Sequence, residues 1–175
     1  MAWRQQTRIH FGAHGWLNGV GNPSDADTQA GHITRMTGNE ELIKGLNEDL
    51  AAEWGTIMRY TYQAGKAVGL RGAEFREILE KEIPDEIGHA KYLTDVIADL
   101  GGEPTTAPRA FDKPNDIKQM VELDLKMEQE DVKNYTAHSK LAEELGNTEL
   151  KVKLEEMAAD ESAHARDLRR ILKGL

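Results

Sequence analysis

An internal repeat at an offset of 75 positions limits what this chain can fold into more than any other feature of the sequence. Each half carries one glutamate and, 33 positions later, a Glu-x-x-His pair. The two sets are Glu53, Glu86 and His89, and Glu128, Glu161 and His164. Matched leucines and alanines would mean little in a helical sequence, but Asp49, Tyr60 and Asp85 also recur at this offset. The sequence therefore predicts two copies of one helical hairpin, related by a pseudo-twofold axis.

Apolar residues recur at helical spacing from Asn39 onward. Thr37 and Glu40 fit a capping box at the start of the first helix, with Asn39 as a rival cap. We expect helices from Asn39 to a break at Gly69–Gly72, and over residues 73–100, 115–145 and 148–173. The connection from Gly101 to Pro114 is long and polar, whereas Gly146-Asn147 is a tight turn. Short, long and short connections predict an all-α four-helix bundle with one crossover between its second and third helices.

Residues 1–38 differ from the rest, because they are rich in glycine and lack helical periodicity. We expect an irregular N-terminal arm there, followed by the bundle domain at residues 39–175. Trp3, Phe11 and Trp16 are candidates to anchor the arm, and a neighbouring subunit is favoured over the chain's own bundle as the anchoring surface. The arm also holds His10, His14 and His32, and such histidines in a glycine-rich segment are more often ordinary loop residues than metal ligands.

Composition excludes several classes of protein. The chain has no Cys, which excludes disulfides, thiolate metal sites and iron–sulfur or rubredoxin-type centres. A net charge of −9 argues against nucleic acid as the main partner and favours the attraction of cations. No apolar run approaches the roughly 18 residues of a membrane span, and the N-terminus lacks the order of a signal peptide. We expect a soluble, cytoplasmic protein with no membrane partner.

The repeated glutamates fall where a bundle helix would place leucine. Glu53 lies between Leu50 and Ile57 on one stripe, and the other three glutamates occupy equivalent positions. Burying an unpaired carboxylate costs more than a domain's stability margin can absorb, so such a layer needs bound cations or protonation. Each histidine follows its glutamate at the third position and shares its helix face. A lone Glu-x-x-His is usually surface chemistry, but this doubled set is the inventory of a carboxylate-bridged metal pair. Oxygen and imidazole ligands favour iron or manganese over structural zinc.

Three further residues qualify this picture. Tyr60 and Tyr135 stand two turns after the first glutamate of each set. For Tyr135 we favour core packing with its hydroxyl bonded to a site carboxylate, whereas for Tyr60 an added redox or ligand-supporting role stays open. Pro84 lies inside the second helix, where it removes a backbone hydrogen bond. It either kinks the helix and re-aims Glu86, or it begins a new helical segment.

Four segments, residues 46–60, 82–93, 124–134 and 160–168, resemble bacterioferritin and related ferritin-like proteins. The resemblance covers about residues 40–173 and fills all six ligand positions. It implies terminal carboxylates at Glu53 and Glu128, bridging carboxylates at Glu86 and Glu161, and terminal imidazoles at His89 and His164. Tyr60 matches the family's tyrosine beside this ferroxidase centre. Glu82 and Asp85 match acidic residues that line the iron route into it.

The chain departs from bacterioferritin in ways that affect cofactor and assembly. The haem-ligating Met of that family follows the first bridging Glu, and this position is Ile87 here, so we expect no haem. Only eleven residues follow His164, which leaves no room for the fifth helix of the 24-subunit cage. A twelve-subunit shell like that of the Dps relatives is therefore favoured over 24. The cysteine pair of many such relatives is absent, which leaves the subgroup open.

The resemblance implies a ferroxidase that stores or detoxifies iron. Two Fe ions bind per subunit (Mn is possible), and O₂ or H₂O₂ takes two electrons, with a mineral held inside a hollow homo-oligomer. The six ligands and Tyr60 form the expected catalytic set. The alternatives are a rubrerythrin-like peroxidase without storage, a manganese catalase and a DNA-protecting Dps-type cage. Arg4, Arg8 and Arg35 are too few to favour strong phosphate binding by the arm.

Overall fold

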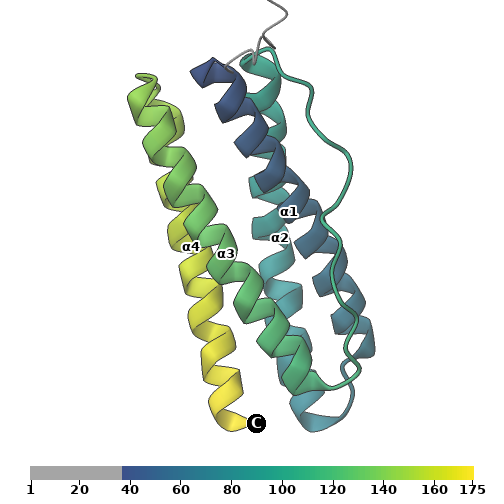
Figure 1. The fold of residues 1–175 in the computed structure, drawn as a ribbon. Coiled ribbons are helices and arrows are strands. Elements are labelled where there is room, and N and C mark those ends of the chain that lie inside the picture. Colours follow the sequence, from purple (N-terminus) through teal and green to yellow (C-terminus); the bar gives the residue numbers. More distant parts are fainter. Residues whose placement is uncertain (1–36) are drawn as a thin grey trace, which may run out of the picture. The chain divides into compact units, whose positions relative to one another are not determined.

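The computed structural model describes residues 37–175, which form four long helices (Figure 1). The helices are α1 (Gly38–Lys66), α2 (Gly69–Asp99), α3 (Ile117–Glu144) and α4 (Thr148–Gly174). No strand occurs within this range, so the predicted all-α bundle with one long crossover is confirmed. The predicted arm, with its three histidines and its aromatic anchors, lies outside the described residues apart from its last two positions.

The first helix begins as the sequence predicts. The Thr37 backbone N–H donates to Glu40 Oε2 at 2.8 Å, and the Glu40 N–H donates to Thr37 Oγ1 at 3.3 Å. This reciprocal pair is the capping box, and Asn39 is inside the helix instead of capping it.

The predicted break over Gly69–Gly72 is wrong, because α2 already begins at Gly69 and only Ala67 and Val68 separate it from α1. Gly69 makes the sharp turn with a φ of +78°, a backbone region that favours glycine. Gly72 lies inside α2, where a Cβ would come within 2.8 Å of the Ala67 carbonyl carbon. Its glycine therefore permits a close approach and does not end a helix.

Helix α2 runs without interruption through Pro84. Pro84 therefore does not begin a new helical segment, although it still lacks the N–H that the helical ladder would use. The effect of Pro84 on the direction of α2 stays a prediction.

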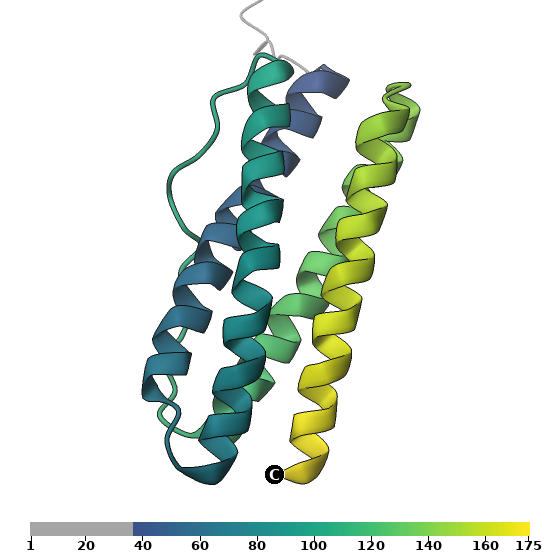
Figure 2. The same ribbon diagram turned by 180° about the vertical axis from the view of Figure 1, so that it is seen from behind.

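The helices form two antiparallel hairpins, α1 with α2 and α3 with α4 (Figures 1 and 2). The crossover runs the length of the bundle beside α1, so α3 starts near the α1–α2 turn (Figure 1). Trp54 Nε1 donates to the Thr105 carbonyl at 3.2 Å, and the Arg109 N–H donates to the Ala51 carbonyl at 2.6 Å. The crossover is thus fixed against α1 over the middle of the bundle. Gly55 leaves room for it, since a Cβ there would meet the Arg109 carbonyl oxygen at 2.7 Å.

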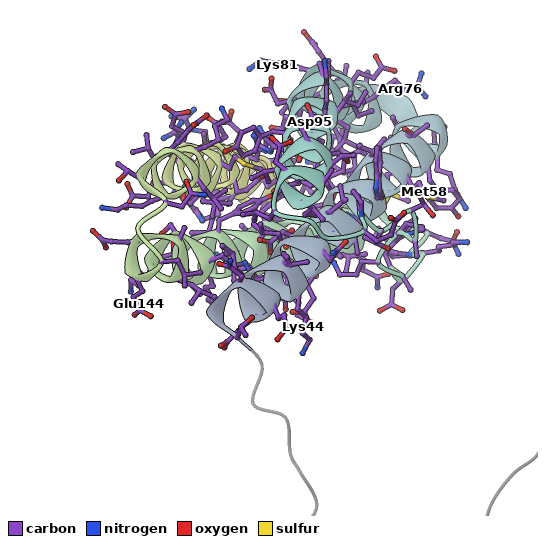
Figure 3. All side chains as sticks on the ribbon, turned by 90° about the horizontal axis from the view of Figure 1, so that it is seen from above. Lys44, Met58, Arg76, Lys81, Asp95 and Glu144 are labelled. Carbon is purple, nitrogen blue, oxygen red and sulfur yellow. The ribbon has the colours of Figure 1, made fainter. Side chains whose placement is uncertain are left out.

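The core consists of two apolar clusters at different heights in the bundle. One cluster includes Leu46, Leu50, Leu93 and Leu154, and the other includes Phe75, Leu79, Met120, Val121 and Leu168. Charged side chains such as Lys44, Lys81 and Glu144 lie on the outside of the bundle (Figure 3). None of the described helices is long and apolar enough to span a bilayer. Between the two clusters all four helices contribute buried polar residues, and these form the candidate site.

Candidate metal centre

The structure brings all six repeated residues together in the middle of the bundle. Helix α1 supplies Glu53, α2 supplies Glu86 and His89, α3 supplies Glu128, and α4 supplies Glu161 and His164. None of the six is more than 7% exposed. The predicted burial of this layer is therefore confirmed, and each helix contributes to it.

The six residues form two overlapping groups of four. In each group one ligand atom per residue lies within 4.8 Å of all the others. The groups are Glu53, Glu86, His89 and Glu161, and Glu86, Glu128, Glu161 and His164. Glu86 and Glu161 belong to both groups. This geometry allows two cations to share two carboxylates, with one further carboxylate and one imidazole for each cation.

Several polar atoms of this layer lack a hydrogen-bond partner among the described residues. They are Glu53 Oε2, Glu86 Oε1, Glu161 Oε1 and His89 Nδ1. Glu86 Oε1, Glu161 Oε1 and His89 Nδ1 lie 2.9–3.2 Å from site partners without good hydrogen-bond geometry, whereas Glu53 Oε2 has no such neighbour among residues 37–175. Buried polar atoms are nearly always satisfied in proteins, so this layer is suited to a further ligand. Oxygen and imidazole nitrogen are suitable ligands for iron or manganese, so the residues fit a pair of such ions.

Each histidine is oriented by carboxylates on both sides of its ring. His89 Nδ1 lies 2.9 Å from Glu161 Oε1, and His164 Nδ1 lies 3.2 Å from Glu86 Oε1. On the other side, His89 Nε2 lies 3.4 Å from Asp160 and His164 Nε2 lies 3.9 Å from Asp85. A ligating histidine usually presents one ring nitrogen to the metal while a carboxylate receives the N–H of the other. His89 has this arrangement, whereas Asp85 lies beyond hydrogen-bond distance of His164, and both rings have Nδ1 facing the site.

In the protein without metal, protons take the place of cations. Burial, with the charges of Glu86 and Glu161, raises the pKa of Glu53 and of Glu128 well above the ordinary value. Burial alone would lower the histidine pKa values, but neighbouring carboxylates outweigh it and raise the pKa of His89 to about 10 and that of His164 to about 12. Burial likewise opposes ionisation of Glu86, yet hydrogen bonds from both histidines bring the pKa of Glu86 below its usual range. The buried carboxylates therefore favour bound protons or cations in this layer.

The two tyrosines link the hairpins at the site. The Tyr60 hydroxyl of α1 donates to Glu128 Oε1 of α3 at 2.6 Å, and the Tyr135 hydroxyl of α3 donates to Glu53 Oε1 of α1. Tyr135 therefore has the role that the sequence predicts for it. Tyr60 supports a site carboxylate in the same way, and its redox role stays a prediction.

Sequence reasoning missed a buried arginine beside the site. Arg59 is fully buried, with Nε donating to Asp124 at 2.8 Å and Nη2 donating to Glu128 at 3.2 Å. Gln63 also donates to Asp124, at 3.0 Å. The available signal was that Asp124 recurs at the repeat offset and that Arg59 adjoins the inward-facing Tyr60.

The two acids predicted to line the iron route have different surroundings. Glu82 is 4% exposed, and its Oε2 has no partner among residues 37–175. Burial raises the pKa of Glu82 to about 7. The side chain of Asp85 is 66% exposed and faces His164. One acid is thus at the surface and the other is buried one helical turn before Glu86. Ile87, at the haem-methionine position, is half exposed.

Comparison with known proteins supports this arrangement. The model of the ferritin-like domain family matches residues 43–175. A solved structure described as a ferritin-like diiron-carboxylate protein from Bacillus anthracis is 41% identical, covering 79% of this chain and 99% of that one, with a TM-score of 0.76. A bacterioferritin from Mycobacterium tuberculosis is 26% identical, covering 79% of this chain and 87% of its own, with a TM-score of 0.68.

A curated relative points to another branch. The DNA protection during starvation protein of Pyrococcus furiosus is 32% identical over 84 residues, which are 48% of this chain and 40% of that protein. This chain therefore matches less than half of the length of that relative.

Proposed function

The chain belongs to the ferritin-like domain family, and from that premise we propose that it oxidises Fe²⁺ to Fe³⁺ at a paired-metal site and stores or detoxifies the iron. The observation that carries the proposal is the pair of overlapping ligand groups that share Glu86 and Glu161. Four buried carboxylates and two imidazoles have no comparable role in packing. The similarity to a diiron-carboxylate protein at 41% identity supports iron as the metal.

The six ligands divide into bridging and terminal residues in this proposal. Glu86 and Glu161 bridge the two Fe²⁺ substrate ions, while Glu53 with His89, and Glu128 with His164, complete the two positions. O₂ or H₂O₂ takes two electrons, one from each ion. The protons held by the histidines and by Glu53 and Glu128 leave as the ions bind, because ligands must be deprotonated.

The residues around the ligands guide iron and hold the geometry. Asp85 is exposed beside His164, and Glu82 is buried one turn away, so together they offer successive carboxylates on a route from the surface. Tyr60 and Tyr135 hold the terminal carboxylates by hydrogen bonds that join the two hairpins. Tyr60 is also our candidate for donating an electron.

Storage needs an enclosed space, so the proposal includes a hollow homo-oligomeric shell, with twelve subunits favoured over 24. We also propose that the protein works without haem, since Ile87 offers no ligand atom. Native mass spectrometry of the purified protein measures the subunit number. A stable monomer or dimer would leave oxidation possible and would remove storage. The absorption spectrum of the same sample tests for haem.

The oxidation itself is tested by rapid mixing. Protein loaded anaerobically with two Fe²⁺ per chain is mixed with O₂ or with H₂O₂, and the Fe³⁺ absorbance is followed. We expect oxidation far faster than that of free Fe²⁺, and the faster oxidant identifies the physiological one. Glu86→Ala should remove the rapid phase, while Glu80→Ala, an exposed glutamate on the same helix, should keep it. Equal rates in both variants would contradict the proposal.

A Dps-type cage that protects DNA is the second candidate, favoured by the Pyrococcus furiosus relative. It uses the same site, so the two candidates differ only in binding to DNA. A gel-shift assay with the full chain at physiological salt distinguishes them, because non-specific DNA binding depends strongly on salt. A net charge of −9 leads us to expect no shift.

A further inference from the structure

The two metal positions have matched ligands but unmatched surroundings. The tyrosine hydrogen bonds to Glu128 and Glu53 join residues that are matched at the repeat offset. Arg59 does not, because its counterpart at the repeat offset is Asn134. A guanidinium therefore bonds the terminal glutamate of one position, and a half-buried asparagine stands at the matched sequence position in α3.

The positive charge of Arg59 is permanent. The side chain is fully buried between Asp124 and Glu128, and its Nη1 points at Met127 Sδ, 3.1 Å away. Burial would lower the pKa of Arg59, but the charge of Asp124 outweighs burial and raises it above its already high usual value. The guanidinium therefore keeps its proton at any pH at which the protein is folded.

This contact limits what Glu128 can offer to a metal. Glu128 Oε1 accepts two hydrogen bonds, from Tyr60 at 2.6 Å and from Arg59 at 3.2 Å. Glu53 Oε1 accepts the Tyr135 hydroxyl, and Glu53 Oε2 has no partner among the described residues. A charge-assisted hydrogen bond withdraws negative charge from its acceptor, and a fixed cation repels a second cation in a buried site.

We propose that Arg59 makes the two metal positions unequal, so that a divalent cation binds more tightly at Glu53 and His89 and fills this position before that of Glu128 and His164. This inference rests on the proposed paired-metal site and adds the order in which it fills. Arg59 is a positioning residue, because it acts on the metal through Glu128. Sequential filling gives the second ion a weaker position from which it leaves more readily.

Two acids act in the opposite direction. Asp124 accepts from Arg59 at 2.8 Å and offsets part of its charge, although Asp49 is a matched buried acid in the other half. Glu82 has Met157 as its matched residue, so it adds a carboxylate on the side of His164 only. It belongs to neither group of ligand atoms that lie within 4.8 Å of one another, whereas Arg59 bonds a ligand directly. Burial also favours the neutral form of Glu82. Contact with the ligand therefore outweighs the more distant charge.

The test uses Zn²⁺, which binds without redox chemistry, at one ion per chain. Crystals of the full chain are measured at the zinc absorption edge, and the anomalous peaks give the occupancy of each position. We expect dissociation constants that differ by about tenfold, which at one ion per chain gives about threefold higher occupancy at Glu53 and His89. Equal occupancy, or a preference for Glu128 and His164, would overturn the inference. Zinc at neither position would instead contradict the proposed paired-metal site.

A variant of α1 that carries the α3 residues at two matched positions tests the role of Arg59. Arg59→Asn combined with Gln63→His reproduces the Asn134 and His138 of α3 in α1. We expect its two occupancies to become equal to within about 1.5-fold, since the direct charge–ligand contact is gone. A folded variant that keeps the threefold ratio would overturn the assignment to Arg59. Should this variant not fold, the native crystals still decide the order of filling.

The matched control is Arg76→Asn. Arg76 is a half-buried arginine whose guanidinium donates to the backbone carbonyls of Ala64 and Ala67, at 2.8 and 2.9 Å. Its loss should lower stability and leave the occupancy ratio unchanged. A comparable loss of the ratio in this control would show that any removed arginine has the effect, and it would also overturn the assignment.

Discussion

The α1–α2 hairpin and the α3–α4 hairpin carry the same ligands and different supports. Glu53, Glu86 and His89 have matched partners in the second hairpin, and the two tyrosines exchange equivalent hydrogen bonds. Arg59 and Glu82, by contrast, are matched by Asn134 and Met157. The difference shows that the six ligand candidates and their tyrosine partners are repeated, whereas the charged residues Arg59 and Glu82 around them are not. Properties of the ligand set should therefore be symmetric, and properties that depend on Arg59 or Glu82 should not.

The two halves also differ in the residues that neutralise a matched pair of buried acids. Asp49 and Asp124 are matched, buried acids. Asp49 Oδ2 lies 2.6 Å from His138 Nδ1, whereas Asp124 Oδ1 accepts from Gln63 at 3.0 Å and from Arg59 at 2.8 Å. Gln63 and His138 are themselves counterparts at the repeat offset. One acid is therefore balanced by a group that titrates and the other by a permanent cation.

The largest expected effect comes from the metal that both halves share. A divalent metal at 1,000 times its dissociation constant should raise the free energy of unfolding by about 4 kcal/mol, because it binds only the folded protein. Thermal unfolding with and without Mn²⁺ measures this gain. A midpoint that does not respond to metal would contradict a preformed site.

The same gain should depend on pH. The raised pKa values of His89, about 10, and His164, about 12, give the metal-free protein stability that is complete below pH 6.5 and is lost as the pH rises toward them. The raised pKa values of Glu53 and Glu128 act in the same direction, above pH 4.5. Mn²⁺ replaces these protons, so its stabilisation should be greater at pH 8 than at pH 6. The opposite trend would show that protons do not compete with the metal.

Removing either bridging carboxylate should affect oxidation equally. Glu86→Ala and Glu161→Ala should each slow rapid Fe²⁺ oxidation by at least about 100-fold, since even residues that only support metal ligands often matter by 10 to 100-fold. Rapid mixing with O₂ measures both rates. Glu80→Ala and Glu155→Ala form a matched control pair, because both residues are exposed and lie at the repeat offset. A loss confined to one bridging variant would break the ligand symmetry.

Removing the tyrosine hydroxyls should lower stability by different amounts in the two halves. Tyr135→Phe removes a buried donor from Glu53 and should cost about 2 kcal/mol, whereas Tyr60→Phe leaves Glu128 with its bond from Arg59 and should cost about 1 kcal/mol or less. Chemical denaturation of the metal-free variants at pH 7 measures the difference. Equal losses would mean that Arg59 does not support Glu128 energetically.

The smallest effect should come from His138. Burial lowers its pKa, but the bond to Asp49 outweighs burial and raises it above 6.5. This pair therefore adds stability that is complete below pH 6.5 and is lost as the pH rises through the raised value. His138→Gln, which copies Gln63, should cost about 1 kcal/mol at pH 6 and less at pH 9. An equal cost at both pH values would show that His138 is uncharged beside Asp49.

The sequence identifies the buried polar layer because its residues are doubled, and their role as metal ligands stays a prediction. A fixed offset, together with glutamates in positions expected for leucine, is enough to identify six residues, and all six are buried together. The capping box at Thr37 is a local pattern and was equally accessible. The long crossover followed from the spacing of the predicted helices.

Other features depend on contacts that periodicity does not reveal. Gly72 reads as a helix breaker in the sequence, and only its close approach to Ala67 explains a glycine inside α2. Arg59 reads as one more charged residue on a long helix. Its burial depends on Asp124 and Glu128, which lie in another helix, 65 and 69 positions further along the chain. A single helix stripe cannot show whether such a partner exists.

The most direct test of the paired-metal site is diffraction at the iron edge from crystals saturated anaerobically with Fe²⁺. We expect two anomalous peaks per chain, about 3.5–4 Å apart, with Glu86 and Glu161 between them and one histidine beside each. A single peak, or iron bound only on the outer faces of the bundle, would contradict the paired-metal site.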